Sequence, residues 1–229
     1  MKTTIASREQ GNFSLLDLLI MIVAAGAVVA SGYIYMESQR TGAKAQQINC
    51  VNNLKCVGLA YRLWGGDNGD KYPGQVSTNA GGTMELVANG FAFPDFIVMS
   101  NELSTPKIVV CPNDKARSFA AGFGSLTNDA NVSYFTSPAA DETIPDMWLS
   151  GDRNIATNTV VVGPGLISFP TNRVMSWTSG IHNHKGNLAM ADGSVQQLAD
   201  AGLQRSVTNA IRAYRMATTN APEPRLIIP

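Results

Sequence analysis

The chain has 229 residues, with 17 basic and 17 acidic side chains and a formal net charge of zero at pH 7. A balanced charge gives no general electrostatic attraction to nucleic acid or to anionic lipid, so we expect no nucleic-acid binding. The length and a hydrophobic content of 45%, raised by one long apolar run near the N-terminus, allow one membrane segment and one modest domain.

The apolar run from Phe13 to Met36 predicts a membrane-spanning helix. It has 24 residues and one charged side chain, Asp17. At about 1.5 Å per residue it extends roughly 36 Å, enough to cross a hydrocarbon core of about 30 Å. A secretory signal peptide cleaved between Ala30 and Ser31 is the alternative, but the run is longer than the apolar part of such peptides and contains an acid. A carboxylate in the bilayer costs about 2.5 to 3.5 kcal/mol, which suggests that Asp17 has a use.

The helix is predicted to continue from Glu37 to Trp64, because this stretch has no proline and its apolar residues recur every three or four positions. These residues are Ile48, Val51, Leu54, Val57, Tyr61 and Trp64. Left-handed conformations in the stretch from Gly65 to Asp70 are expected to end the helix. The chain thus divides into a leader at residues 1–12, a transmembrane helix at 13–36, its extension into the domain at 37–64, and a loop-rich domain at 65–229.

The signals after Pro73 are shorter. They predict a short helix at 84–89, short strands at 96–99 and 108–111, mostly loop and short strand at 113–150, and a strand or loop edge at 159–162. Residues 187–191 and 194–198 predict a β-hairpin, in which Asp192-Gly193 forms a two-residue type I′ turn and Met190 lies opposite Val195. A helix is expected at 201–216 and an irregular tail at 222–229. Together these elements indicate an α+β fold, with a long N-terminal helix packed on a small antiparallel sheet.

Three cysteines, Cys50, Cys56 and Cys111, follow the membrane segment. They lie in a compartment that permits disulfides if the basic leader stays in the cytoplasm. Cys50 and Cys56 are about 9 Å apart along one helix and about 240° apart around it, so they cannot pair without unwinding that helix. Cys111 therefore pairs with one of them or with neither.

The segment from Gly11 to Leu19, Gly-Asn-Phe-Ser-Leu-Leu-Asp-Leu-Leu, follows a short leader with two basic residues. It resembles the N-terminus of type IV prepilins and type II secretion pseudopilins. In that family a dedicated peptidase cuts after a glycine, the new first residue is usually an N-methylated phenylalanine, and an acid lies fifth in the mature chain. If Phe13 becomes the first residue, Asp17 is fifth but Asn12 precedes the cut; if the cut follows Gly11, Asp17 is sixth. The resemblance implies that residues 11–13 form the cleavage region and that Asp17 neutralises an N-terminal amine during assembly.

A second resemblance involves a Cys-x-Asn-Asn-Leu-Lys helix and a C-terminal His-x9-Asp-Gly motif, which many planctomycete and verrucomicrobial proteins combine with a prepilin-type N-terminus. The matching residues are Cys50, Asn52, Asn53, Leu54, Lys55, His182, Asp192 and Gly193. Cys111-Pro112 and residues 151–154 also resemble that group. The resemblance implies a membrane-tethered, pilin-like protein with a Cys50–Cys111 disulfide. Cys56 is then a free, apolar-like residue on the more buried final turns of the helix.

His182 has two interpretations. It is a ligand or catalytic group with His184, Asp192 or Asp152 as its partner, or it hydrogen-bonds a nearby loop while Asp192-Gly193 serves the turn. We expect the structural role, because a hairpin needs its turn residues for geometry alone. His182 and His184 would offer two nitrogens to a metal, but no Cys or Glu lies at a helpful spacing, so no metal site is predicted.

The stretch from Asp67 to Asp70 has oxygen ligands and a glycine, as calcium loops do. It lacks the later bidentate acid of a full loop, which favours helix capping instead. The sequence contains no Gly-x-Ser-x-Gly elbow and no glycine-rich phosphate loop with a following Lys-Ser/Thr. We therefore predict no enzymatic activity and no cofactor.

These patterns predict a structural subunit of a type II secretion or type IV pilus-type filament. The implied location is the inner membrane, crossed once, with a cytoplasmic N-terminus and a periplasmic or cell-surface domain. The implied partners are the membrane, a prepilin peptidase and other pilin-like subunits. Two alternatives stay open: a membrane-tethered module that binds a solute, glycan or protein, and an exported soluble protein that loses roughly its first 30 residues.

Overall fold

A computed structural model describes residues 14–169, 173–218 and 221–229. Contacts divide the chain into two compact units, residues 1–44 and residues 45–229. The predicted leader at 1–12 and the cleavage-region residues Gly11, Asn12 and Phe13 lie outside the described residues.

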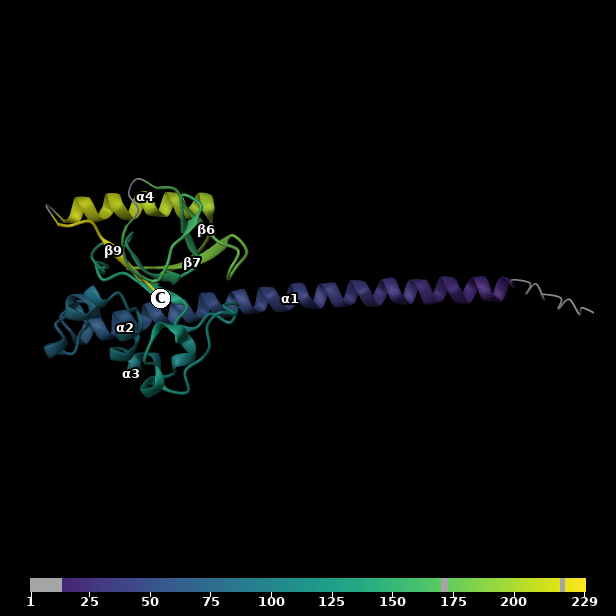
Figure 1. Ribbon diagram of the computed structural model, residues 1–229, viewed down its shortest axis with the longest axis horizontal. Coiled ribbons are helices and arrows are strands. Elements are labelled where there is room, and N and C mark those ends of the chain that lie inside the picture. Colours follow the sequence, from purple (N-terminus) through teal and green to yellow (C-terminus); the bar gives the residue numbers. More distant parts are fainter. Residues whose placement is uncertain (1–13, 170–172, 219–220) are drawn as a thin grey trace, which may run out of the picture. The chain divides into compact units, whose positions relative to one another are not determined.

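Helix α1 runs from Leu15 to Asp67 without a proline to interrupt its backbone hydrogen bonds (Figure 1). In the first unit, the side chains from Leu15 to Met36 are exposed, as a segment surrounded by lipid requires. Among the described residues, α1 is the one helix that is long and apolar enough to cross a membrane.

The C-terminal end of α1 lies three residues beyond the predicted end at Trp64. Gly69 and Asp70 adopt left-handed φ values of 69° and 60°, which stop the helix as predicted. The side-chain amide of Asn68 donates to the Trp64 carbonyl at 2.7 Å. The stretch after Trp64 therefore terminates and caps the helix.

Short helical segments fill residues 73–131. They are η1 (Pro73–Gln75), η2 (Thr78–Ala80), η3 (Met84–Asn89), α2 (Phe93–Val98), α3 (Ser100–Leu103), η4 (Pro106–Val109), η5 (Phe123–Ser125) and η6 (Asp129–Asn131). The short helix at 84–89 is confirmed, but the strands predicted at 96–99 and 108–111 are wrong, because both stretches lie in or beside helical turns. Each turn has a proline in its first two positions, where its fixed φ favours a helix start. In both stretches the proline therefore favoured a helical turn, and the apolar residues after it did not form a strand.

The larger sheet has six antiparallel strands in the order β5-β9-β1-β2-β7-β8. Its strands are β1 (Tyr134–Thr136), β2 (Trp148–Asp152), β5 (Gly165–Ser168), β7 (Lys185–Met190), β8 (Val195–Ala199) and β9 (Arg225–Ile228). A smaller sheet joins β4 (Val160–Val161), β3 (Ile155–Thr157) and β6 (Met175–Trp177) in that order. The stretch predicted at 159–162 as a strand or loop edge thus contains β4.

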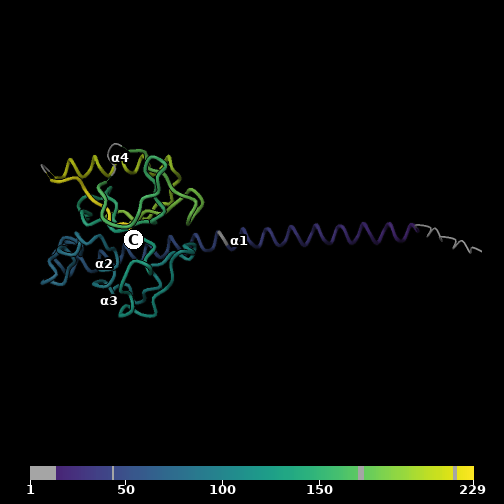
Figure 2. Tube along the Cα trace, in the orientation of Figure 1, coloured from purple at the N-terminus to yellow at the C-terminus, as the bar shows by residue number. Residues whose placement is uncertain are grey.

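The C-terminal tail was predicted to be irregular, and this is wrong for Arg225–Ile228. These residues form β9, which pairs with both β5 and β1. The chain trace ends inside the second unit (Figure 2), where Pro229 is buried and its carbonyl accepts a hydrogen bond from Arg117 Nη2 at 2.8 Å.

The hairpin of β7 and β8 is confirmed, but its turn differs from the prediction. Ala189 pairs with Val195, one residue before the predicted Met190. Residues 191–194 connect the two strands, and the Met190 carbonyl accepts a hydrogen bond from Gly193 N at 2.9 Å. Gly193 has a φ of 83° but Asp192 does not adopt a positive φ, whereas a type I′ turn requires both. A turn followed by a left-handed glycine therefore replaces the predicted two-residue turn.

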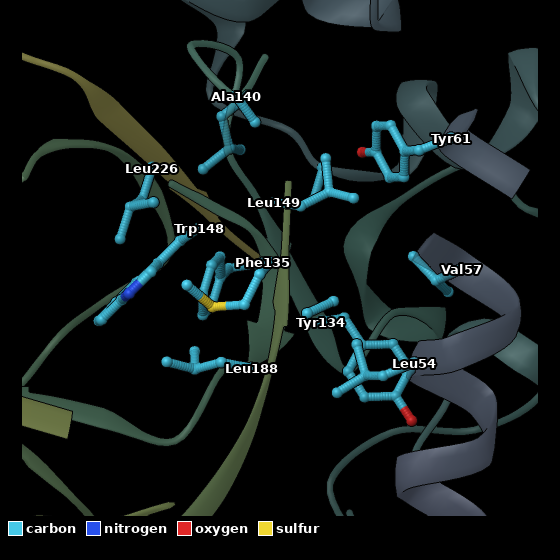
Figure 3. Packing of buried hydrophobic residues seen from close by; sticks show 14 of the residues in the cluster. Leu54, Val57, Tyr61, Tyr134, Phe135, Ala140, Trp148, Leu149, Leu188 and Leu226 are labelled. Atoms are coloured by element: carbon cyan, nitrogen blue, oxygen red, sulfur yellow. The ribbon is translucent and has the colours of Figure 1, made fainter. Parts of the chain in front are cut away.

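Two helices cover the larger sheet within the second unit. Figure 3 shows Tyr134 and Leu149 on the side of the sheet that faces Leu54 and Val57 of α1. On the opposite side, Trp148 donates to Ser206 of helix α4 at 2.8 Å. Helix α4 (Asp200–Ala217) confirms the helix predicted at 201–216. The fold is α+β, with a long N-terminal helix packed on an antiparallel sheet.

Candidate functional site

The Cys50–Cys111 disulfide joins α1 to the segment that follows η4. Both cysteines are fully buried, and the pairing that the family resemblance implied is confirmed. Asn53, one turn along α1 from Cys50, donates from its side-chain amide to the Val110 carbonyl at 3.1 Å. Leu54 lies in the core. This motif therefore fixes one face of α1 to the domain.

The remaining two matched residues of this motif, Asn52 and Lys55, are exposed. Cys56 is also exposed and free, so the prediction that it is buried among the last helical turns is wrong. Val57 and Tyr61 take the buried positions on those turns. The helix keeps one exposed face, and Cys56 lies on it.

His182 is buried against the disulfide. Its Nε2 lies 3.4 Å from Cys111 Sγ and 3.4 Å from Asp152 Oδ2, and its Nδ1 lies 3.1 Å from the side-chain amide nitrogen of Asn113. With Asn113 donating to Nδ1, the ring hydrogen is on Nε2 and points between the sulfur and the carboxylate. We call Cys50, Cys111, His182 and Asp152 the sulfur–histidine–aspartate cluster.

Burial controls the charges in this cluster. Loss of solvent lowers the pKa of His182 to about 4 and raises the pKa of Asp152 to about 7. Asp152 Oδ2 accepts hydrogen bonds from the backbone and side-chain nitrogens of Asn187, at 2.7 and 2.9 Å. Its Oδ1 is buried and has no hydrogen-bond partner among the described residues. At neutral pH the imidazole is uncharged, so its 3.4 Å contact with Asp152 is not an ion pair.

Residues 151–154, at the end of β2 and directly after it, surround the cluster. A Cβ on Gly151 would lie 2.8 Å from Phe135 Cε1 and from the Asn187 carbonyl, so no larger residue fits there. Arg153 makes two hydrogen bonds to Asp114, at 2.7 and 2.8 Å, and holds the loop after Cys111. Asn154 donates to the carbonyls on both sides of the His182 loop, those of residues 178 and 185.

Asp192 and Gly193 lie at a different place from His182, although the sequence motif joins them. A Cβ added to Gly58 of α1 would be 3.3 Å from Gly193 Cα, and one added to Gly193 would be 3.0 Å from Arg62 Cδ. Asp192 Oδ1 accepts from the backbone nitrogen of residue 194 at 2.8 Å. The turn therefore packs directly on α1 and serves the geometry of the hairpin.

Of the three partners considered for His182, Asp152 is the one in contact. Asp192 belongs to the turn, and Nδ1 of His184 lies 3.1 Å from the Trp177 carbonyl. Sequence reasoning missed Asn113 and Asn187, which complete the hydrogen bonds of the cluster. The one available signal for Asn113 was its position two residues after Cys111.

The two halves of the C-terminal motif hold α1 at two points. His182 packs on the disulfide of Cys50, and Gly193 packs on Gly58. These helix positions are eight residues apart, or about 12 Å along the axis. The motif residues therefore fasten the sheet to more than two turns of the same helix.

Another buried carboxylate, Asp95 of α2, was not found from the sequence. It accepts hydrogen bonds from Tyr61 of α1 at 3.2 Å and from Thr83 at 2.5 Å. Burial raises its pKa. This contact adds a polar attachment of α1 to the short helical segments.

In the first unit, Asp17 lies in the first turn of α1 and is exposed. Its Oδ2 accepts a hydrogen bond from Ser14 N at 3.0 Å, and Ser14 Oγ accepts from Leu16 N at 3.1 Å. A carboxylate at this end of a helix also interacts favourably with the helix dipole. Asp17 therefore has a local capping role at the start of α1.

In comparisons with protein-family models, with curated proteins and with solved structures, nothing matched this chain.

Proposed function

We propose that the protein is a membrane-anchored, pilin-like structural subunit of a filament of the type II secretion or type IV pilus type. In this proposal the N-terminus is cytoplasmic, α1 crosses the inner membrane once, and the domain lies in the periplasm or at the cell surface. Assembly follows cleavage by a prepilin peptidase and joins the chain to other pilin-like subunits.

The observation that carries the proposal is that one helix is both the apolar segment and the core of the domain. α1 continues from its exposed apolar residues to the buried side chains of Leu54, Val57 and Tyr61. The Cys50–Cys111 disulfide and the packing of Gly193 on Gly58 attach the domain to it. A subunit pulled out of a membrane by its helix needs this attachment, whereas a displayed binding domain works on a flexible linker.

The proposal can be tested at Asp17, which would pair with the N-terminal amine of a neighbouring subunit. A buried N-terminal amine from a neighbouring subunit would cost several kcal/mol without a counter-charge, and Asp17 provides one. Because Asp17 also caps α1, the variant must remove the charge and keep the cap. Asp17→Asn does so, since the amide oxygen still accepts from Ser14 N.

The experiment uses Cys56, the exposed free thiol on α1. A membrane-impermeant maleimide should label Cys56 in intact cells with a permeabilised outer membrane, which places the domain outside the inner membrane. In a separate, unlabelled sample of native wild-type membranes, a bis-maleimide should cross-link subunits through Cys56. We expect Asp17→Asn to reduce the cross-linked fraction several-fold at equal expression.

Ser14→Ala is the matched control, because it removes the hydrogen bond to Leu16 N and leaves the Asp17 charge. Cys56→Ser shows that the product depends on this thiol. Equal cross-linking of Asp17→Asn and the wild type would reduce Asp17 to a helix cap. Cross-linking of neither protein would favour the tethered binding module, and a mature chain that begins near residue 31 would favour the exported protein.

A further inference from the structure

The sulfur–histidine–aspartate cluster contains the donor set of a metal site whose two sulfurs are joined in a disulfide. The sulfurs of Cys50 and Cys111 and the nearest ring nitrogen of His182 lie within 4.8 Å of one another. Asp152 Oδ2 lies 3.4 Å from the same His182 nitrogen. All four residues are buried. We propose that reduction of the disulfide converts this cluster into a binding site for one zinc ion, which leaves when the disulfide forms again.

The distances support tetrahedral coordination. Zinc binds thiolate sulfur at about 2.3 Å and histidine nitrogen or carboxylate oxygen at about 2.0 to 2.2 Å, so tetrahedral ligand atoms lie about 3.3 to 3.8 Å apart. His182 Nε2 is 3.4 Å from Cys111 Sγ and 3.4 Å from Asp152 Oδ2. These two edges of the tetrahedron are therefore already in place, and the released Cys50 sulfur completes it by rotating about its own Cα–Cβ bond.

Asp152 gives an independent reason to expect a cation. Its Oδ1 is a fully buried carboxylate oxygen without a hydrogen-bond partner among the described residues. An unpaired buried polar atom of this kind is costly. Meanwhile Oδ2 is held by the two nitrogens of Asn187, which fix the direction of the carboxylate. A cation bound at Oδ2 beside His182 would neutralise this buried carboxylate, whose hydrogen bonding is incomplete.

Asn113 completes the outer layer of the site. A zinc-bound Nε2 requires the ring hydrogen on Nδ1, which lies 3.1 Å from the Asn113 side chain. Rotation of the Asn113 amide presents its oxygen to Nδ1–H in place of its nitrogen. Hydrogen bonds of this kind orient histidine ligands in zinc proteins.

Reduction of the disulfide, zinc binding and reoxidation each conserve electrons and protons. A dithiol reductant gives two electrons and two protons to the disulfide, which yields the Cys50 and Cys111 thiols and the cyclic disulfide of the reductant. Zinc then displaces the two thiol protons, and the His182 hydrogen moves from Nε2 to Nδ1 without a net change. A disulfide oxidant then takes two electrons from the zinc-bound thiolates and is itself reduced to a dithiol with two protons from water, which forms the Cys50–Cys111 disulfide again and releases Zn²⁺. The site is independent of filament assembly.

The test uses the full chain in detergent micelles, with and without a phosphine reductant under anaerobic conditions. Zn²⁺ is titrated against a chromophoric chelator, and Co²⁺ replaces zinc as a spectroscopic probe. We expect one zinc per reduced chain, the intense visible bands of a tetrahedral cobalt thiolate, and no stoichiometric binding to the oxidised chain.

Variants assign the ligands. His182→Ala and Asp152→Asn should each weaken zinc binding at least tenfold, whereas His184→Ala and Cys56→Ser should keep the wild-type affinity. His184 and Cys56 are the matched controls because each offers the same ligand atom outside the cluster. Unchanged affinity in His182→Ala or Asp152→Asn, or loss of binding in Cys56→Ser, would overturn the proposal.

Circular dichroism of the same samples separates binding from folding. If reduction unfolds the domain, zinc should restore the folded spectrum, because metal binding is then coupled to folding. A reduced chain that stays folded without taking up zinc, or that zinc does not refold, would refute the site.

Discussion

At the scale of single residues, His182 shows how burial decides a side chain's role. Its ring is enclosed by the disulfide sulfur, the Asn113 amide and the Asp152 carboxylate. Burial keeps the ring uncharged at neutral pH, so a proton that enters it must break this arrangement.

This burial predicts a pH dependence of stability in the oxidised protein. The pKa of His182 is about 4 in the folded chain and its ordinary value is 6.5, so between these values the unfolded chain binds a proton that the folded chain does not. The free energy of unfolding should therefore fall as the pH decreases from about 6.5 to about 4. The loss that belongs to His182 is on the order of 2 to 3 kcal/mol.

Urea unfolding of the wild type and of His182→Gln across this range isolates the His182 contribution. Asp152 titrates in the opposite sense in both proteins, because its pKa is raised, so the difference between the two curves is the informative quantity. As the pH falls, the free energy of unfolding of the wild type should decrease relative to that of His182→Gln. A difference that stays constant from pH 7.5 to pH 4 would show that His182 does not resist protonation.

At the scale of elements, the β7–β8 hairpin acts on α1 through its turn. Gly193 combines a left-handed φ of 83° with close approach to Gly58 and Arg62. A side chain at this position therefore meets two obstacles, backbone strain and the helix surface. Gly81 has a φ of 90° and nothing within 4 Å of an added Cβ, so a side chain there meets only the backbone strain.

We expect Gly193→Ala to lower the free energy of unfolding more than Gly81→Ala. Each substitution should cost about 1 kcal/mol for its left-handed backbone. Gly193→Ala should cost roughly another 1 kcal/mol, because Arg62 or the turn must move. Denaturant unfolding of both variants measures the difference. Equal losses would mean that the hairpin does not depend on its contact with α1.

At the scale of the whole second unit, the last strand connects the sheet. β9 lies between β5 and β1, and Leu226, Ile227 and Ile228 are buried. β5 pairs with β9, so the C-terminal residues join β5 to the remainder of the sheet. A short terminal segment thus contributes to the centre of the fold.

Ile227→Ala should therefore be strongly destabilising, by about 2 to 5 kcal/mol, because it leaves a cavity between buried side chains. Arg225→Ala, in the same strand but exposed, should change stability by less than about 0.5 kcal/mol. Thermal unfolding followed by circular dichroism compares the two variants. A mild effect of Ile227→Ala would show that β9 is dispensable for the sheet.

The sequence by itself determined the elements with strong local signals. An uninterrupted apolar and amphipathic run predicted α1, glycine and aspartate residues predicted its end, and periodic apolar residues predicted α4. The hairpin followed from Asp192-Gly193, although its turn type did not, because that depends on the φ of both residues. The cysteine pairing came from the family resemblance, since spacing alone left Cys50 and Cys56 as alternatives.

Only the tertiary structure decided the contacts between distant segments. β9 has no turn signal of its own and forms because two strands remote in sequence offer it hydrogen bonds on both sides. The sulfur–histidine–aspartate cluster brings together residues 50, 111, 152 and 182, and the spacing of His182 and His184 gave no sign of the disulfide sulfurs beside His182. Local propensity extends over a few residues, whereas long-range strand pairing and side-chain burial depend on how the whole unit packs.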